Sequence, residues 1–256
     1  MKSYLINLDG DTDRLAFFSS NFKRLGLSYE RVCAIDGRTF SDADYARFQK
    51  TRTKNYSFWL RGQMGCFLSH YHVWQKVAQS EDNFCAVFED DIHASDDLKK
   101  ILDEQSWIPN DVDIIRLETS TNRIQLTSDP VLKHAGRTLY GVKSTSWCSG
   151  AYILSRRAAQ AFIDLEEQYH QPTDVIMYNF ERSAITKKLN ILQCYPAVCT
   201  QDKHLLNGND VKFASNIEAP TTKEPAIKTA LKYALPANFF AAAYRSLKGY
   251  RRITFE

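Results

Sequence analysis

The sequence predicts an α/β domain in which helices flank a mainly parallel β-sheet. Apolar runs of strand length alternate with helical patterns along most of the chain. One such run, at 84–88, leads directly into Glu89, Asp90 and Asp91. This is the expected pattern where a buried strand ends at the ligand-binding edge of an open sheet. The 256 residues, of which 44% are hydrophobic, are enough to bury the core of such a domain.

The elements of the first half follow from the spacing of apolar and turn-forming residues. Polar clusters end the apolar strands, and the helices have apolar positions at steps of three and four. In order, we expect a strand at 4–8, a helix ending near Gly26, a strand at 29–35, a short polar helix at 42–49, a loop at 50–62 and a helix at 63–79.

The second half continues the alternation around a longer polar stretch. Ser155 precedes a helical pattern and is a favoured residue type for an N-cap. After the acidic strand we expect a helix at 98–102, a strand at 112–117, a loop or hairpin at 119–136, a strand at 150–154, a helix from Ser155 and a strand at 190–195. Residues 1–217 are therefore expected to form one domain.

Cysteine usage and hydropathy indicate the compartment. The six cysteines form no C-x-x-C pair and mostly lie within apolar patterns. This favours reduced, packed thiols in a cytosol over a disulfide framework or a zinc site. The chain starts without a signal-peptide pattern, and no apolar run approaches the roughly 18 residues of a membrane-spanning helix. We therefore expect a cytoplasmic protein.

The end of the chain differs from the rest in charge. Residues 223–256 carry a net charge of +5, so residues 1–222 carry −2 of the overall +3. Such an acidic body argues against nucleic-acid binding, which needs a basic face. In the expected tail, 218–256, an aromatic and apolar helical stripe at 239–247 has basic residues beside it, which is typical of a helix on an anionic membrane. The alternative is a helix that docks on the body or on a partner subunit.

The carboxylates Glu89, Asp90 and Asp91 are a candidate metal site. Three adjacent like charges lower stability unless a cation lies among them, and carboxylate oxygens suit Mg²⁺ or Mn²⁺. If the strand geometry continues, Glu89 and Asp91 point to the same side. The alternative is a solvated turn after the strand.

Seven segments form an ordered series of motifs along residues 1–217. They are 4-YLINLDGDTDRL-15, 34-AIDG-37, 65-GCFLSH-70, 87-VFEDD-91, 149-SGAYILSRRAA-159, 173-TD-174 and 195-YPAVCTQD-202. Their order and spacing resemble the family 25 glycosyltransferases of lipooligosaccharide and lipopolysaccharide biosynthesis, whose eukaryotic relatives include collagen β-galactosyltransferases. The resemblance implies a GT-A nucleotide-sugar fold, with a Rossmann-like mixed sheet flanked by helices.

The resemblance also implies an activity, which is an inverting transfer of a hexose from a UDP-sugar with Mn²⁺ or Mg²⁺ as cofactor. It favours galactose from UDP-galactose as the donor and a lipooligosaccharide or other glycan as the acceptor. A lipid-linked acceptor fits a basic tail that brings a cytoplasmic enzyme to the inner membrane.

The resemblance assigns roles to the acidic residues. Glu89 and Asp91 are expected to bind the metal, and Asp90 to make a supporting contact with the donor sugar or a structural contact. His204 is expected to complete the metal shell, and its alternative is a solvated loop histidine. Asp174 is the candidate base that takes the proton of the acceptor hydroxyl. Its alternative role is a helix N-terminal cap.

Other residues are expected to bind the nucleotide sugar. Asn7 and Leu8 lie at the first strand end, and the fork of donors on Arg14 suits a phosphate. The alternative for Arg14 is a charge pair at the helix start. His70 could contact the donor or be a core histidine, and Asp202 could orient the donor or the acceptor sugar.

Two other classes of protein remain open from the sequence. The first is a carbohydrate-binding relative without catalytic activity, against which Glu89, Asp91 and Asp174 argue. The second is a metal-dependent phosphoesterase that uses the acidic strand end, but it would need a nucleophile or several clustered histidines, and the six histidines are scattered.

Overall fold

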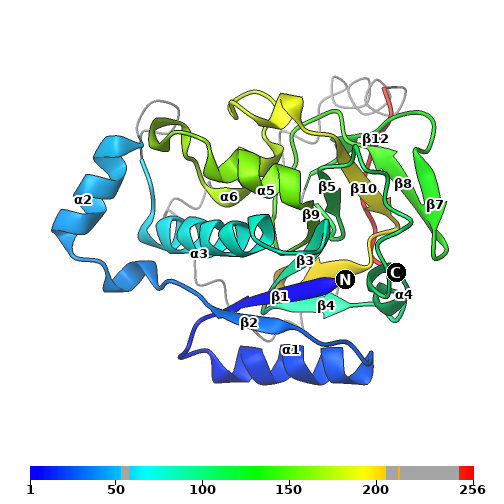
Figure 1. Cartoon of the computed structure of the whole chain (residues 1–256), viewed down its shortest axis with the longest axis horizontal. Coiled ribbons are helices and arrows are strands. Elements are labelled where there is room, and N and C mark those ends of the chain that lie inside the picture. Colours follow the sequence, from blue (N-terminus) through cyan, green and yellow to red (C-terminus); the bar gives the residue numbers. More distant parts are fainter. Residues whose placement is uncertain (53–57, 121, 206–212, 214–247) are drawn as a thin grey trace, which may run out of the picture.

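The central β-sheet has eight strands, and helices cover both of its faces (Figure 1). The structure is a computed structural model that describes residues 1–52, 58–120, 122–205, 213 and 248–256. The strand order is β2-β1-β3-β9-β5-β10-β8-β7. This architecture confirms the α/β class, with a mixed sheet flanked by helices.

The elements have the following bounds. The strands are β1 Lys2–Asn7, β2 Glu30–Cys33, β3 Phe84–Glu89, β4 Ile92–Ala94, β5 Ile114–Arg116, β6 Ile124–Gln125, β7 Leu132–His134, β8 Arg137–Gly141, β9 Ala151–Ser155, β10 Ile191–Tyr195, β11 Cys199–Gln201 and β12 Tyr250–Arg251. The α-helices are α1 Thr12–Arg24, α2 Asp42–Thr51, α3 Arg61–Ala78, α4 Leu98–Leu102, α5 Arg156–Ile163 and α6 Thr173–Tyr178. Short 3₁₀ helices lie at Gly37–Thr39, Glu167–Tyr169, Thr186–Lys188 and Asp202–His204.

Strand direction differs from the mainly parallel sheet that the sequence predicts. β1 runs parallel to β2 and β3, and β5 runs parallel to β10. β9 lies between β3 and β5 and is antiparallel to both. The loop that enters β9 therefore lies at the edge of the sheet where β3 and β5 end. The carboxylates after β3 are thus close to the loop before β9 as well as to the segment after β5.

The two faces of the sheet pack into separate cores. Alternate strand residues point to opposite faces, so Tyr4 and Leu5 belong to different cores. The core with Tyr4 packs against α3, α5 and α6, and the core with Leu5 packs against α1 and α4. Burial on both faces explains why β3 is a continuous apolar run.

Several local predictions are confirmed. The Ser155 hydroxyl accepts a hydrogen bond from the Ala158 amide at 3.1 Å and caps α5. All six cysteines are free thiols. Cys33 is exposed, and the others are buried or half-buried. The polar stretch 119–136 contributes β6 and β7, and β7 forms a hairpin with β8.

The last residues of the chain pack on the domain. β12 pairs with β6, and Ile253 is buried. Ala197 exchanges backbone hydrogen bonds with Thr254 and Glu256. The amphipathic stripe expected at 239–247 lies outside the described residues. Among those that the structure describes, no helix is long and apolar enough to cross a membrane.

Candidate active site

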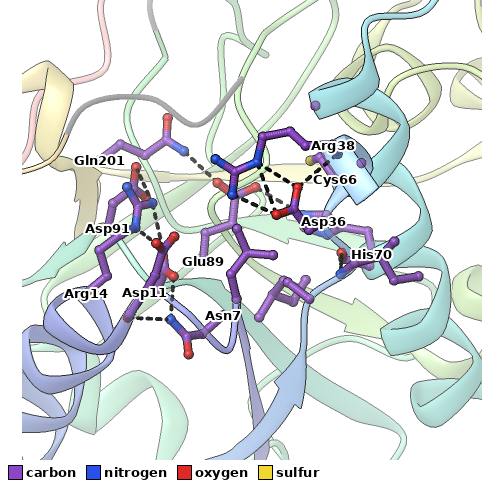
Figure 2. Close-up of a pocket in the computed structure, with 18 of the residues that line it drawn as sticks. Asn7, Asp11, Arg14, Asp36, Arg38, Cys66, His70, Glu89, Asp91 and Gln201 are labelled. Carbon is purple, nitrogen blue, oxygen red and sulfur yellow. Dashed lines mark hydrogen bonds and ion pairs between the residues drawn. The ribbon is translucent and has the colours of Figure 1, made fainter. Parts of the chain in front are cut away.

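A pocket opens where β1 and β3 end, beside the first half of α3 (Figure 2). It spans about 790 Å³ of empty space, part of which is open to solvent. Its walls are formed by residues 6–8, 34–38 and 89–91, together with residues from the start of α1, from α3, from the end of β11 and from the segment after β11. Of the residues expected from sequence to bind donor or metal, the lining contains Asn7, Leu8, Arg14, His70, Glu89, Asp90 and Asp91.

Two glycines let α3 approach the turn after β2. A Cβ on Gly65 would lie against backbone atoms of Ile35 and Gly37, and one on Gly37 would meet the backbone of Arg61. The Ser69 hydroxyl donates to the Gly65 carbonyl at 2.7 Å and accepts from the Ile35 amide at 2.8 Å. This packing places Cys66 and His70 on the pocket wall.

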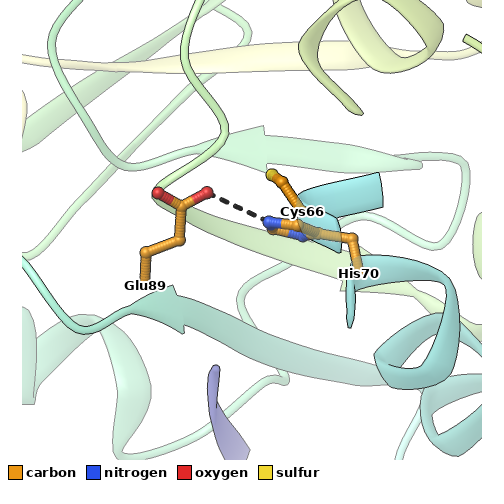
Figure 3. Close-up of side chains that lie close together, drawn as sticks. All are labelled: Cys66, His70 and Glu89. Carbon is orange, nitrogen blue, oxygen red and sulfur yellow. Dashed lines mark hydrogen bonds and ion pairs between the residues drawn. The ribbon is translucent and has the colours of Figure 1, made fainter. Parts of the chain in front are cut away.

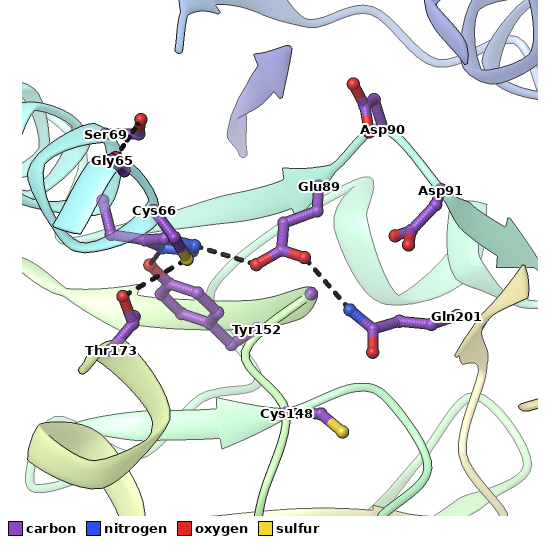
Figure 4. Close-up of polar contacts among 12 residues, drawn as sticks. Gly65, Cys66, Ser69, Glu89, Asp90, Asp91, Cys148, Tyr152, Thr173 and Gln201 are labelled. Atoms are coloured by element: carbon purple, nitrogen blue, oxygen red, sulfur yellow. Dashed lines mark hydrogen bonds and ion pairs between the residues drawn. The ribbon is translucent and has the colours of Figure 1, made fainter. Parts of the chain in front are cut away.

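The carboxylate of Asp90 points away from the side on which Glu89 and Asp91 lie (Figure 4). One of its oxygens accepts from Arg14 Nε at 2.6 Å, and the other accepts from Asn7 Nδ2 at 2.7 Å. Burial raises the pKa of Asp90 and outweighs the lowering by Arg14 and Asn7. Burial alone would lower the pKa of Arg14, but the Asp90 hydrogen bond and the nearby carboxylates raise it overall.

Asp91 carries an oxygen that has no partner in the described part of the chain. Its Oδ1 is buried and accepts no hydrogen bond, while Oδ2 lies 3.4 Å from Arg14 Nη2. Burial, followed by the charge of Glu89, raises the pKa of Asp91 to about 7. A buried carboxylate oxygen without a donor fits a cation, and Glu89 offers a second oxygen ligand nearby.

Glu89 belongs to a network of hydrogen-bonded side chains in the protein interior. Trp74 Nε1 donates to the Tyr152 hydroxyl at 3.0 Å, which lies 2.8 Å from His70 Nδ1. His70 Nε2 lies 3.1 Å from Glu89 Oε1, and Gln201 Nε2 donates to Glu89 Oε2 at 3.0 Å. Burial alone would raise the pKa of Glu89, but His70 and the neighbouring cationic groups lower it. His70 is therefore both a buried histidine and a pocket residue.

The other three predicted site residues do not line this pocket. Asp202 is buried. Its Oδ1 lies 2.7 Å from His93 Nε2, and its Oδ2 accepts a hydrogen bond from the Phe213 amide at 2.9 Å. His204 Nε2 lies 3.5 Å from Cys148 Sγ. Asp174 is the second residue of α6, whose N-cap position is Pro172, so Asp174 does not occupy the cap.

Asp174 nevertheless has an unusual environment. Burial raises its pKa, although backbone amides of Cys148 and Val175 lower it in part. The preceding residue, Thr173, lies with its hydroxyl 3.6 Å from Cys66 Sγ, and Cys66 is on the pocket wall. The start of α6 is thus next to the pocket.

The loop that enters β9 is fixed at the same edge. Cys148 has φ +74°, a left-handed conformation that costs free energy in a residue other than glycine. Arg116 donates to the carbonyls of Trp147 at 2.9 Å and Cys148 at 3.2 Å. Glu118 Oε1 accepts from the Gly150 amide at 2.7 Å. Buried polar groups thus hold a strained backbone beside Asp174.

Sequence reasoning missed several residues of this edge. Lys203 is an exposed cation in the lining and forms no ion pair with another described residue. Gln201 bonds Glu89, and Cys66 lies beside His70. Cys66 was part of the motif 65–70, whereas Gln201 carries no charge that could have marked it.

Comparisons with known proteins identify the family. The model of glycosyltransferase family 25 (LPS biosynthesis protein) matches residues 1–177. The chain is 26% identical over 226 residues to the lacto-N-neotetraose biosynthesis glycosyltransferase LgtB of Neisseria meningitidis serogroup B, covering 84% of this chain and 80% of the relative. It is 26% identical over 246 residues to LgtE of the same organism, covering 91% and 86%.

A third relative comes from another genus. The lipooligosaccharide biosynthesis protein lic2B of Haemophilus influenzae is 27% identical over 177 residues, covering 65% of this chain and 64% of the relative. The family model spans more than half of the chain, in the part that carries most of the pocket lining. The chain therefore belongs to glycosyltransferase family 25, a family of LPS biosynthesis proteins.

Proposed function

We propose that this glycosyltransferase moves a hexose, galactose from UDP-galactose, onto a lipooligosaccharide or lipopolysaccharide acceptor with inversion at the anomeric carbon. One observation carries the proposal. The pocket at the ends of β1 and β3 brings carboxylate oxygens together with the cationic side chains of Arg14 and Lys203. A nucleoside diphosphate has that mixed requirement, because its phosphates need cations and its metal needs oxygen ligands. A donor bound as in a GT-A-like fold would have its phosphates and its metal at this edge of the sheet.

Glu89 and Asp91 would hold Mn²⁺ or Mg²⁺. The free oxygen of Asp91 and the pocket-facing carboxylate of Glu89 suit such a hard cation. When bound, the cation neutralises negative charge on the departing UDP. His204, the third ligand expected from sequence, contacts Cys148 here, so we assign only the two carboxylates.

The remaining lining residues would orient the donor. Arg14 presents a guanidinium whose direction is set by Asp90, and Lys203 offers a second, exposed cation. Asn7, the last residue of β1, and the following Leu8 line the pocket and would lie along the nucleotide. The two cations would hold the diphosphate, so that the sugar points toward α6.

Asp174 would be the general base. As the acceptor oxygen attacks the anomeric carbon, its hydroxyl proton passes to the Asp174 carboxylate, and the bond to UDP breaks on the opposite face. A carboxylate whose pKa is raised by burial accepts a proton more readily near neutral pH than an exposed one. The contact between Thr173 and Cys66 supports a position of this base close to the donor.

We also propose that the enzyme works in the cytoplasm at the inner membrane. The net charge of +5 over residues 223–256 would attract the chain to anionic lipids, where a lipid-linked acceptor resides. Most of these residues lie outside the described part of the chain, so the support here is charge and sequence pattern alone.

The test is release of UDP from a panel of UDP-sugars, with and without Mn²⁺, using deacylated lipooligosaccharide as the acceptor. Metal-dependent turnover of one sugar that needs the acceptor and is lost in Asp91→Ala would support the proposal and name the donor. A carbohydrate-binding relative would turn over no sugar. A phosphoesterase would cleave the donor equally well without an acceptor. Either result would reject the proposed transfer.

A further inference from the structure

Three potential metal ligands of different chemistry meet on the pocket wall (Figure 3). Cys66 Sγ, a ring nitrogen of His70 and a carboxylate oxygen of Glu89 all lie within 4.8 Å of one another. Cys66 and His70 are one helical turn apart on α3, so their side chains lie on the same face. Glu89 approaches them from the end of β3. The group therefore depends on the packing of α3 against the sheet.

Each of these side chains is oriented by an outer partner. Thr173 Oγ1 lies 3.6 Å from Cys66 Sγ, and the Tyr152 hydroxyl lies 2.8 Å from His70 Nδ1. Gln201 donates to the second oxygen of Glu89 at 3.0 Å. Metal ligands in proteins usually have such partners, which fix the ring orientation and hold the carboxylate in place.

We propose that Cys66, His70 and Glu89 form a site for a zinc-type divalent cation. Thiolate and imidazole select Zn²⁺ over Mg²⁺ or Mn²⁺, which prefer oxygen ligands. Three protein ligands would leave one position of a tetrahedral ion for an exchangeable ligand, as in catalytic zinc sites. A chain without C-x-x-C pairs lacks the usual cysteine-rich structural site, but this site needs a single thiol.

Binding rearranges protons in a defined way. The Trp74 indole donates to Tyr152, so the Tyr152 hydroxyl can donate to His70 Nδ1, which leaves the Nε2 hydrogen for Glu89. With Nε2 on a metal, the ring hydrogen would have to be on Nδ1 and be donated to the Tyr152 oxygen, and the hydroxyl hydrogen of Tyr152 would turn away from the ring. The thiol of Cys66 gives its proton to solvent.

The site has a consequence for the hard cation that we propose at Glu89 and Asp91. Glu89 belongs to both groups, so a zinc ion held by Cys66 and His70 would take one of the two carboxylates from Mn²⁺ or Mg²⁺. Zn²⁺ is then a competitor of the activating cation. The site itself does not depend on the proposed transfer, because its occupancy is measured without nucleotide or acceptor.

The test is a titration of the metal-free protein with Co²⁺, which replaces Zn²⁺ and reports a thiolate ligand by a near-ultraviolet charge-transfer band. We expect the band in the wild type, its displacement by equimolar Zn²⁺, and its persistence in excess Mg²⁺. Cys66→Ser should abolish the band. Cys148→Ser is the matched control, because the thiol of Cys148 also lies near a histidine, His204, and it should retain the band.

Further variants separate this site from the hard-cation site. Asp91→Asn should keep the cobalt band with unchanged affinity for Co²⁺. Tyr152→Phe should also show the band, but its affinity for Co²⁺ should be about 10–100-fold weaker, because the outer partner of His70 is lost. Circular dichroism of each variant checks that it is folded. Absence of the band in the wild type would overturn the proposal. A band that survives Cys66→Ser, or that disappears in Cys148→Ser, would also overturn it.

Discussion

Asp90 holds the guanidinium of Arg14 through a single carboxylate oxygen, which lies 2.6 Å from both Nε and Nη2. Its second oxygen accepts from Asn7 Nδ2 at 2.7 Å. Asp90 therefore orients a cation and does not share the role of its neighbours, although all three carboxylates are consecutive. This division helps to explain how three consecutive acidic residues coexist, because Asp90 is bonded to Arg14 and Asn7, whereas Glu89 and Asp91 lie on the other side of the chain.

Arg14→Lys should weaken UDP binding at least about tenfold. Lysine keeps the positive charge but lacks the planar fork that Asp90 orients, and a charge-assisted hydrogen bond contributes about 1.5–3 kcal/mol. Isothermal titration with UDP and Mn²⁺ measures the change. Arg24→Lys on the same helix is the matched control, because Arg24 pairs with Asp96 at the surface. Equal dissociation constants in both variants would contradict a role for Arg14 in binding the diphosphate.

Asp91→Asn should remove the effect of Mn²⁺ on UDP binding. The amide cannot provide the anionic oxygen that the cation needs, so UDP affinity in Mn²⁺ should fall to the metal-free value of the wild type. Titration with UDP in Mn²⁺ and in EDTA gives both affinities. Asp96→Asn, at an exposed position, should retain the Mn²⁺ effect. If Asp91→Asn retained it too, the cation would have to bind elsewhere.

Asp174→Asn should lower kcat by about 10²–10⁴, the usual contribution of a positioned general base, with little change in the KM of the donor. The reason is that asparagine cannot accept the acceptor proton, whereas the donor contacts remain. Steady-state kinetics at saturating acceptor separates the two constants. The exposed Asp164, after α5, offers Asp164→Asn as control. A large rise in donor KM with normal kcat would assign Asp174 to donor binding instead.

The sequence predicts correctly those elements whose formation depends on neighbouring residues. The apolar run before Glu89 is a buried strand, and Ser155 caps its helix. The direction of β9 was not predicted, because strand pairing is a long-range property that no local period records. The same limit applies to Gln201, a neutral residue that becomes part of the site only when β11 lies beside β4 and brings it to Glu89.

The histidines of the site also show that long-range contacts cannot be predicted from local sequence. The sequence leaves His70 open as a core histidine or a donor-contacting one, and the structure shows a buried histidine in the pocket lining, with Tyr152 and Glu89 at its two ring nitrogens. His204 was expected near the metal on its chemistry, yet it contacts Cys148. Residue type indicates what a side chain can bind, whereas its partner is decided by tertiary packing.

Gly65→Ala should destabilise the fold by about 1–3 kcal/mol, as overpacking commonly does. The added Cβ would meet backbone atoms of Ile35 and Gly37, which cannot move aside without shifting the turn. Urea unfolding measures the free energy. Gly10→Ala is the control, because a Cβ there has no heavy atom within 4 Å. Equal stability of the two variants would show that α3 does not depend on this close approach.

Glu118 should make stability depend on pH. Its side chain is buried, and burial raises its pKa from 4.5 to about 8, with the charge of Arg116 opposing the rise. Between these values the folded state retains a proton that the unfolded state has lost. The free energy of unfolding should therefore fall as pH rises from about 4.5 to about 8, by at most about 5 kcal/mol from this group, and stay level above pH 8.

Glu118→Gln removes the titrating group and can still accept the Gly150 hydrogen bond through its amide oxygen. We expect a smaller loss of stability between pH 5 and pH 8 than in the wild type, measured by urea unfolding in EDTA so that no cation contributes. The comparison uses the difference between two pH values, so a constant cost of the amide cancels. Glu81→Gln, at an exposed position, should behave as the wild type. An unchanged pH dependence in Glu118→Gln would mean that Glu118 does not hold its proton in the folded protein.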